Sequence, residues 1–268
     1  FPYTTLFRSA IGQLINCGCS FAHGYNGEDL TDSQYKVIKF PGLPYLKRSG
    51  YKSVGYYLAE SKNLDYIDLS RNGNSNETIF RTLQYYLDNY DCKNSIVCIG
   101  WTHAFRREYL GWNVKDKKTE WIQYREVPKR NSYFSKLADK IIGPKMSPTM
   151  VEFNERNFRP LAYADHIEYR QYNLMLMTQI ILESKNIPYV MYNGCGNEHD
   201  SKSKDVINLK NKINKQRFLK FTGPSFDKYV LDNPEFISVD AGHPNVKGHK
   251  KWAEMIKPIF EEVVKSYV

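Results

Sequence analysis

Short apolar runs of strand length alternate along this chain with longer segments of helical periodicity, and this alternation limits the folds available to it. The clearest strand is Ser95–Trp101, a continuous β-branched run ended by glycine, as expected for a central strand covered on both faces. Strands that alternate with helices favour a mostly parallel sheet between two layers of helices. We therefore predict an α/β fold, a three-layer α/β/α sandwich with a mostly parallel five-stranded sheet.

The remaining elements are predicted from periodicity and from capping residues. Strands are predicted at residues 14–18, 64–69, 95–101, 187–193 and 235–239. Helices are predicted at residues 51–61, from Ser75 or Asn76 onward, and at 132–142, 166–185, 205–213 and 245–267. The core side of the helix at 166–185 is predicted to carry Tyr169, Tyr172, Leu176, Ile180 and Ile181. The last helix is predicted to face inward with Trp252, Met255, Ile256, Ile259, Phe260 and Val263.

One domain over residues 10–268 is the simplest organisation of the 268 residues. Residues 22–50 are rich in glycine, proline and tyrosine and are predicted to form a long loop over the carboxyl edge of the sheet. Residues 102–163 mix aromatic and charged side chains and are predicted to be an insertion that covers the sheet end. Residues 1–9 look like the in-frame translation of a sequencing adapter, so they are excluded from the fold prediction.

The composition indicates a globular protein and limits the classes of partner that we expect. Hydrophobic residues make up 41% of the chain and charged residues 25%, which is typical of a globular protein with a substantial core. The formal charge of +9 is spread along the sequence, and residues 202–220 are interpreted as a solvated helical face rather than a nucleic-acid-binding patch. No apolar run is long enough for a membrane span.

The five cysteines do not have the spacing of a metal site, and we predict buried free thiols in a reducing, cytoplasmic compartment. They are Cys17, Cys19, Cys92, Cys98 and Cys195. The histidines likewise lack a metal-ligand spacing, so neither a metal nor a cofactor is predicted.

The candidate functional residues lie near the two ends of the chain. The first strand ends at Gly18, and Ser20 follows at the carboxyl end of the sheet, where open α/β folds bind their ligands. Asp240 and His243 stand three residues apart after another short apolar run. Together they could supply a nucleophile, a base and an orienting acid. Read singly, Ser20 could be a turn serine and Asp240 and His243 could be capping residues.

The order of four short blocks resembles the SGNH (GDSL-like) hydrolase family, especially members from viral and environmental genomes whose first block reads Gly-Cys-Ser-Phe. Gly18-Cys19-Ser20-Phe21 matches the nucleophile block, and Asn72-Gly73 matches the block that supplies a backbone donor. Gly100-Trp101-Thr102 stands where the family has Gly-x-Asn, and Asp240-Ala-Gly-His243 matches the Asp-x-x-His block. The resemblance implies a flavodoxin-like sheet.

The resemblance also implies a reaction. Ser20 would attack an ester carbonyl, His243 would take its proton, and Asp240 would orient the imidazole. Backbone N–H groups of Ser20 and Gly73 would form the oxyanion hole. The family's third donor is an asparagine amide, whereas this chain has Thr102 at that place. Asn76 or His103 is the predicted substitute.

Two further residues are predicted to support the site, namely Trp101 and Arg106, the latter as a partner of Glu108 or of an acidic substrate group. The substrate class implied by the resemblance is an ester, with an O-acetyl group on a carbohydrate as the first candidate. Two alternatives stay open: an O-acyltransferase that uses the same acyl-enzyme, and a non-catalytic binding or virion-associated module. Gly73 could equally be only a turn glycine.

Overall fold

A computed structural model describes residues 11–24, 51–104, 106–113, 118–125, 164–196, 201–238 and 242–267 of the chain. Its centre is a five-stranded sheet in the order β2-β1-β3-β6-β7, in which every neighbouring pair is parallel. The strands are β1 (Gln13–Gly18), β2 (Asp65–Asp68), β3 (Ser95–Trp101), β6 (Tyr189–Asn193) and β7 (Phe218–Leu219). The predicted parallel five-stranded sheet is thereby confirmed, with β3 at its centre, and its order is that of flavodoxin-like folds.

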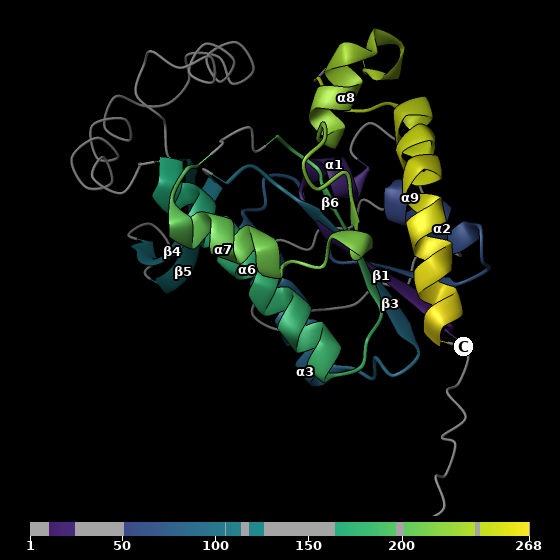
Figure 1. Cartoon of the computed structure of the whole chain (residues 1–268), viewed down its shortest axis with the longest axis horizontal. Coiled ribbons are helices and arrows are strands. Elements are labelled where there is room, and N and C mark those ends of the chain that lie inside the picture. The colour runs from purple at the N-terminus through teal and green to yellow at the C-terminus, as the bar shows by residue number, and fades with distance from the viewer. Residues whose placement is uncertain are drawn as a thin grey trace, which may run out of the picture.

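Helices cover both faces of this sheet, with α2 and α9 on one side and α3, α6 and α7 on the other (Figure 1). They are α2 (Val54–Glu60), α3 (Asn76–Asn89), α6 (Ala164–Ser184), α7 (Lys204–Lys212) and α9 (Val246–Tyr267). Shorter helices are α1 (Ser20–His23), α8 (Phe226–Asp232) and the 3₁₀ turns Lys215–Arg217 and Pro234–Phe236. Ser75 caps α3 as predicted, because its side chain accepts the N–H of Thr78 at 3.1 Å.

Two hydrophobic clusters hold the layers together, one on each face of the sheet, because alternate residues of a strand point to opposite faces. Ile15 of β1 packs with the α3 and α6 side, whereas Leu14 packs with the α9 side. On the α9 side Trp252, Ile256 and Phe260 are fully buried. Each such side chain contributes about 1.5–3 kcal/mol of burial free energy.

The fifth strand was predicted at residues 235–239, and this prediction is wrong. The edge strand is β7 (Phe218–Leu219), and it pairs with Met191 and Tyr192 of β6. The predicted segment begins instead in the 3₁₀ turn Pro234–Phe236, where proline at the start suits a helical turn. A strand of two residues within a lysine-rich segment carries too short an apolar pattern to be detected.

The buried face of α6 matches the prediction in part, because Tyr172 is buried and Leu176 and Ile181 pack against the same cluster. The other two predicted residues are exposed. Tyr169 is 44% exposed and Ile180 is 55% exposed, whereas Ile167, Met175 and Leu182 are buried. The reason is that α6 is apolar on several sides, so its periodicity does not define one face. Polar Glu168 is fully buried because Lys210 of α7 pairs with its carboxylate at 3.0 Å.

After β3 the chain forms an antiparallel hairpin of β4 (Arg106–Asn113) and β5 (Lys118–Arg125), which the sequence analysis treated as part of an insertion without assigned elements. The helix predicted at 132–142 and most of the loop predicted at 22–50 lie outside the described residues.

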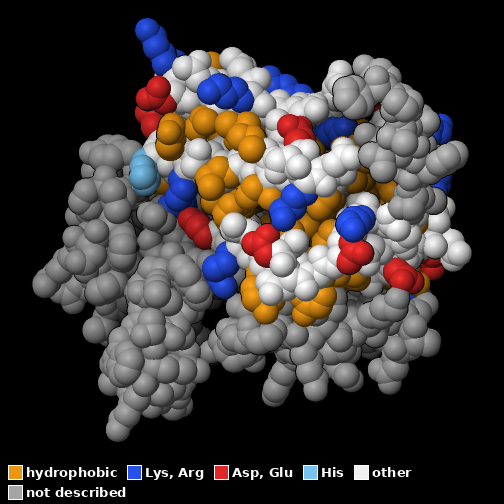
Figure 2. Space-filling view, turned by 90° about the horizontal axis from the view of Figure 1, so that it is seen from below, with side chains coloured by type: hydrophobic (Ala, Val, Ile, Leu, Met, Phe, Trp, Pro, Cys, Tyr) orange, Lys and Arg blue, Asp and Glu red, His pale blue; other side chains and the backbone are white. Residues whose placement is uncertain are grey.

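Charged side chains of both signs lie next to one another on the face seen in Figure 2, rather than in one basic patch. Among the described residues, none of the helices has the length and apolar character that crossing a membrane requires.

Gly18 is the position where the fold leaves least room for a side chain. A Cβ there would lie 2.3 Å from the Cβ of Ala22 and 2.7 Å from the carbonyl oxygen of Gly100. Gly18→Ala is therefore expected to lower the free energy of unfolding by about 1–3 kcal/mol, as overpacking does. Urea unfolding measures this, with Gly12→Ala as the control because a Cβ at Gly12 meets nothing within 4 Å. Equal midpoints for the two variants would contradict the expected crowding.

Candidate active site

Ser20 lies in the turn between β1 and α1, at the carboxyl end of the sheet. The strand ends at Gly18, Cys19 adopts an extended conformation, and Ser20 is the first residue of the one-turn helix. The backbone N–H groups of Ala22 and His23 both donate to the carbonyl of Cys19. The turn ends at Gly24, whose positive φ of 80° suits glycine. This geometry fixes the position of Ser20, which is buried, with 3% of its surface exposed.

His243 approaches Ser20 from the other end of the chain. Its Nε2 lies 3.0 Å from the Oγ of Ser20. The loop is held by the N–H of Ser238, which donates to the carbonyl of His243 at 2.8 Å, and by a bridge between Ile237 and Pro244. The imidazole also packs against the ring of Phe21 in a tilted arrangement, with ring centroids 5.2 Å apart. A serine hydroxyl that donates to a neutral imidazole is the arrangement needed for general-base activation. The predicted third member, Asp240, lies outside the described residues.

The turn that carries Gly73 is attached directly to the nucleophile strand. The carbonyl of Gly18 accepts the N–H of Arg71 at 3.0 Å and the side-chain amide of Asn74 at 2.9 Å. Gly73 has a φ of 82°. In the described part of the chain no acceptor is recorded for the N–H groups of Ser20 and Gly73.

Asn76 and Thr102 are brought together, but not as donors that face Ser20. The side-chain oxygen of Asn76 accepts the N–H of Thr102 at 2.9 Å, and its NH₂ donates to the carbonyl of Thr102 at 3.1 Å. Thr102 itself has no exposed surface. The side-chain amide of Asn76 thus pairs with both backbone polar groups of Thr102, directly after β3. Asn76 therefore positions the end of the segment Gly100-Trp101-Thr102.

The other predicted site residues lie around the same sheet edge. Trp101 is fully buried in the α3 and α6 cluster, so it supports the site from inside the core. His103 lies beside Gly196 and Asp227 rather than beside Ser20. Arg106 begins β4, and its positive charge acts on the neighbouring Cys19. The side chain of Glu108, its predicted partner, lies outside the described residues.

A buried polar network beneath α1 was not anticipated from the sequence. His23 Nδ1 pairs with Asp68 Oδ2 at 3.0 Å, and the other oxygen of Asp68 accepts from the side chain and backbone of Ser70. The amide of Asn16 lies 3.0 Å from the same oxygen and 2.8 Å from the carbonyl of Ala22. The network ties β1 and β2 to the helix that carries Ser20. Asp65 and Asp68 stand at the two ends of the same short strand, so no signal in the sequence singled out Asp68.

All five cysteines are free and buried, as predicted. Cys19 and Cys195 lie with their sulfurs 3.6 Å apart. Either thiol can donate this hydrogen bond; it lowers the pKa of Cys19, while burial raises the pKa of Cys195. The loop after β6 therefore contacts the residue directly before the candidate nucleophile.

Comparison with known proteins gives fold neighbours only. No family model and no curated protein matches the chain. Among solved structures, a lipolytic protein of the G-D-S-L family from Desulfitobacterium hafniense is 10% identical, with a TM-score of 0.42 over 92% of this chain and 98% of that one. A GDSL-like lipase from Parabacteroides merdae is 16% identical, with a TM-score of 0.43 over 94% and 97%. An acetyl-xylooligosaccharide esterase from Geobacillus is 14% identical, with a TM-score of 0.40 over 96% of both chains.

GDSL-type proteins and an acetyl esterase are thus among the structural neighbours of this chain. At these identities and TM-scores the likeness carries no argument about activity. The case for an activity has to come from the residues of this chain.

Asp68→Asn tests the network beneath α1. The substitution removes the buried negative charge that His23, Ser70 and Asn16 contact, and breaking a buried pair of this kind costs about 3–5 kcal/mol. Urea unfolding should show this loss. Asp65→Asn, at the exposed start of the same strand, is the matched control and should change stability by less than about 1 kcal/mol. If Asp68→Asn lowered the free energy of unfolding no more than Asp65→Asn does, the network would contribute little to stability.

Proposed function

We propose that this protein is a serine hydrolase that cleaves an ester through Ser20, His243 and Asp240. The observation that carries the proposal is the 3.0 Å contact between His243 Nε2 and Ser20 Oγ, made by residues that are 223 positions apart. A serine at a strand-to-helix turn, directly hydrogen-bonded to a histidine from a distant loop, has few structural reasons to exist apart from nucleophile activation.

In the proposed reaction the Ser20 oxygen attacks the ester carbonyl while its proton moves to Nε2 of His243. The resulting imidazolium then protonates the departing alkoxide, which leaves as an alcohol, and the acyl group remains on the Ser20 oxygen as an acyl-serine. Water, deprotonated by the same nitrogen, attacks the acyl-serine and releases the acid. Asp240 is proposed to accept a hydrogen bond from the Nδ1–H group of His243 and so to keep Nε2 unprotonated in the resting state.

The oxyanion of each tetrahedral intermediate is proposed to be held by the N–H groups of Ser20 and Gly73. Support comes from the anchoring of the Gly73 turn to the Gly18 carbonyl, two residues before the nucleophile. Each such donor stabilises the transition state by a few kcal/mol, about 10²–10³ in rate. Thr102 stands where the resembled family has its third donor. The side-chain amide of Asn76 hydrogen-bonds to the backbone N–H and carbonyl groups of Thr102. The hole therefore has two assigned donors, and a modest turnover rate is expected.

An O-acetyl group on a carbohydrate is the substrate class we propose to test first, by the resemblance to GDSL-like hydrolases. A small acyl group suits a nucleophile that is itself 3% exposed. Transfer of the acyl group to a sugar hydroxyl instead of water would use the same acyl-serine, and product analysis separates the two outcomes.

A non-catalytic carbohydrate-binding module is the second candidate. It is favoured by the burial of Thr102 and by the engagement of the Asn76 amide, which leave the third donor unassigned. It predicts binding of acetylated glycans without acyl-serine formation.

Labelling by a fluorophosphonate probe tests the nucleophile. The wild-type protein is expected to be labelled on Ser20, whereas Ser20→Ala should not react and His243→Ala should react at least about 10³-fold more slowly. Ser61→Ala and His166→Ala, at the end of α2 and near the start of α6, are matched controls and should be labelled like the wild type. A folded wild-type protein that does not react would favour the binding module.

Asp240→Asn tests the proposed acid. If Asp240 sets the tautomer of His243, hydrolysis of a short-chain nitrophenyl ester should fall by about 10⁴-fold at pH 7 while the melting temperature stays close to that of the wild type. Asp232→Asn, near the end of α8 and exposed, is the matched control and should retain wild-type turnover. Wild-type rates for Asp240→Asn would remove this residue from the mechanism.

A further inference from the structure

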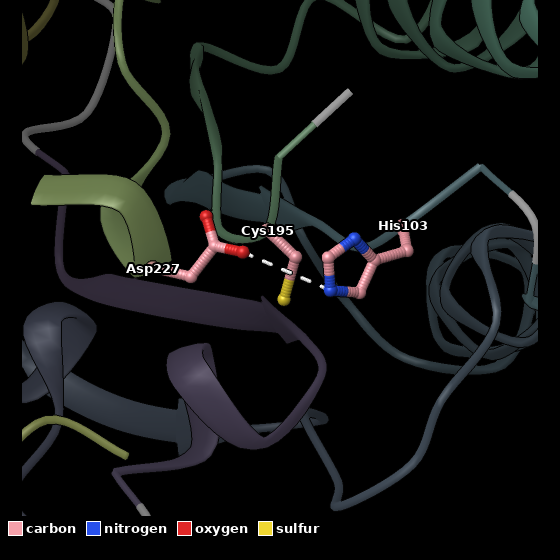
Figure 3. A group of neighbouring side chains, drawn as sticks. All are labelled: His103, Cys195 and Asp227. Atoms are coloured by element: carbon pink, nitrogen blue, oxygen red, sulfur yellow. Dashed lines mark ion pairs between the residues drawn. The ribbon is translucent and has the colours of Figure 1, made fainter. Parts of the chain in front are cut away.

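A second group of reactive side chains lies at the same sheet edge, apart from the Ser20 and His243 contact. His103 follows β3, Cys195 follows β6, and Asp227 lies in the first turn of α8 (Figure 3). One donor atom from each, a ring nitrogen, a sulfur and a carboxylate oxygen, lies within 4.8 Å of the other two. His103 Nε2 and Asp227 Oδ2 are 3.7 Å apart. Because the three residues come from distant segments, no motif in the sequence indicates the group.

Neighbouring groups orient His103 toward this centre. Its Nδ1 lies 3.0 Å from the carbonyl oxygen of Gly196. A carbonyl can only accept, so Nδ1 carries the hydrogen and Nε2 faces Asp227. A metal-ligating histidine commonly has such a hydrogen bond to a backbone carbonyl, which fixes its tautomer and its ring orientation.

Asp227 is oriented in the same manner. Its Oδ1 accepts the hydroxyl of Ser225 and the backbone N–H of Lys228, the latter at 2.7 Å. Two donors on one oxygen leave Oδ2 as the atom turned toward His103. The ring and the carboxylate thus each have an outer partner that holds the inner atom in place.

The loop of Cys195 is fixed by the backbone. The N–H groups of Gly194 and Cys195 both donate to the carbonyl of Trp101, at 2.7 and 3.1 Å. Cys195 is fully buried, whereas the side chains of His103 and Asp227 each keep 17% exposure. The Cys195 sulfur therefore lies on the interior side of the group. The His103 ring and the Asp227 carboxylate lie on its solvent-exposed side.

These donors match one kind of ion. Sulfur, imidazole nitrogen and carboxylate oxygen are the ligands of Zn²⁺, at about 2.3, 2.0–2.1 and 2.0–2.2 Å. At these bond lengths a nitrogen and an oxygen ligand of one tetrahedral ion are about 3.3–3.5 Å apart. The 3.7 Å between His103 Nε2 and Asp227 Oδ2 is slightly longer, so a small inward movement of the two side chains has to accompany binding. A hard ion such as Mg²⁺ or Ca²⁺ would not select a thiolate.

We propose that His103, Cys195 and Asp227 form a Zn²⁺ site, with water as the fourth ligand on the exposed side. Binding replaces the thiol proton of Cys195, which is released to solvent, by the metal. Thiolate and carboxylate together offset the charge of the ion, although the nearby Arg106 guanidinium opposes it. The site joins the ends of β3 and β6 to the start of α8. Its ligand atoms take no part in the proposed ester hydrolysis.

The competing interpretation is a plain ion pair between a protonated His103 and Asp227, with Cys195 as a buried thiol. Co²⁺ distinguishes the two, because a thiolate bound to cobalt gives a charge-transfer band in the near ultraviolet, and tetrahedral cobalt gives visible bands. The full chain, stripped with a chelator, is titrated with Co²⁺ and then with Zn²⁺. We expect one equivalent of Co²⁺ to produce both sets of bands and Zn²⁺ to abolish them.

Variants assign the ligands. Cys195→Ser should remove the charge-transfer band, and His103→Ala and Asp227→Asn should each weaken Zn²⁺ binding by more than about 100-fold. Ser225→Ala, which removes only the outer partner of Asp227, should weaken it by about 10–100-fold. Circular dichroism of each variant establishes that it is folded.

Two cysteine controls complete the experiment. Cys92→Ser, a buried thiol elsewhere in the core, should leave the bands unchanged. Cys19→Ser should also retain them, because the Cys19 sulfur neighbours Cys195 but lies outside the three-donor group. Absence of a charge-transfer band in the wild-type protein, or its persistence in Cys195→Ser, would overturn the proposal. Loss of the band in Cys19→Ser would overturn the assignment of Asp227 and His103 as the partners of a single sulfur.

Discussion

The close pairing of Gly18 with Gly100 is the constraint on which the rest of this sheet edge depends. These residues face each other where β1 and β3 end, and no side chain fits at Gly18 because Ala22 and the Gly100 carbonyl occupy the space. The chain can therefore turn back immediately into α1. The Gly18 carbonyl then receives Arg71 and Asn74, which fixes the turn of Gly73 beside the same strand end. One narrow contact between two strands thus determines where the candidate nucleophile and a backbone donor are placed.

A second set of contacts connects this end of β1 and β3 to the loop after β6, in the other half of the sheet. The carbonyl of Trp101 anchors the loop of Gly194 and Cys195, and the sulfur of Cys195 lies 3.6 Å from that of Cys19, next to Ser20. The group around His103 and the pair Ser20 and His243 are consequently neighbours through two buried thiols. A change in the loop after β6, whether by an ion or by a substitution, would act on the turn of α1 by direct packing rather than over a distance.

Much of the fold could be predicted because its signals are local. The run Ser95–Trp101 is apolar throughout and became the central strand, and Ser75 is a capping serine before a helical pattern. Prediction failed where local pattern and tertiary context differ. β7 is two residues long and is defined only by its pairing with β6. α6 is apolar on several sides, so its buried face is set by packing against α3 and α7. That packing buries Ile167 and Met175 and leaves Tyr169 and Ile180 exposed. At the site, Ser20 and His243 could be chosen by residue type and block order. The Asp68 network and the Asp227 group could not, since each joins segments whose contact exists only in the folded chain.

The two hydrophobic clusters are separated by the sheet, and the candidate catalytic residues are attached to only one of them. Phe21 and Ala22 of α1 pack in the cluster that contains Trp252 and Ile256 of α9, and His243 lies three residues before α9 begins. The opposite cluster, under α3 and α6, contains Cys17 and Trp101 but neither Phe21 nor Ala22. Evolution could therefore vary the two faces at different rates. Repacking beneath α3 and α6 that leaves Cys17 and Trp101 in place is compatible with an unchanged reaction geometry, whereas a shift of the packing beneath α9 displaces the serine and the histidine together.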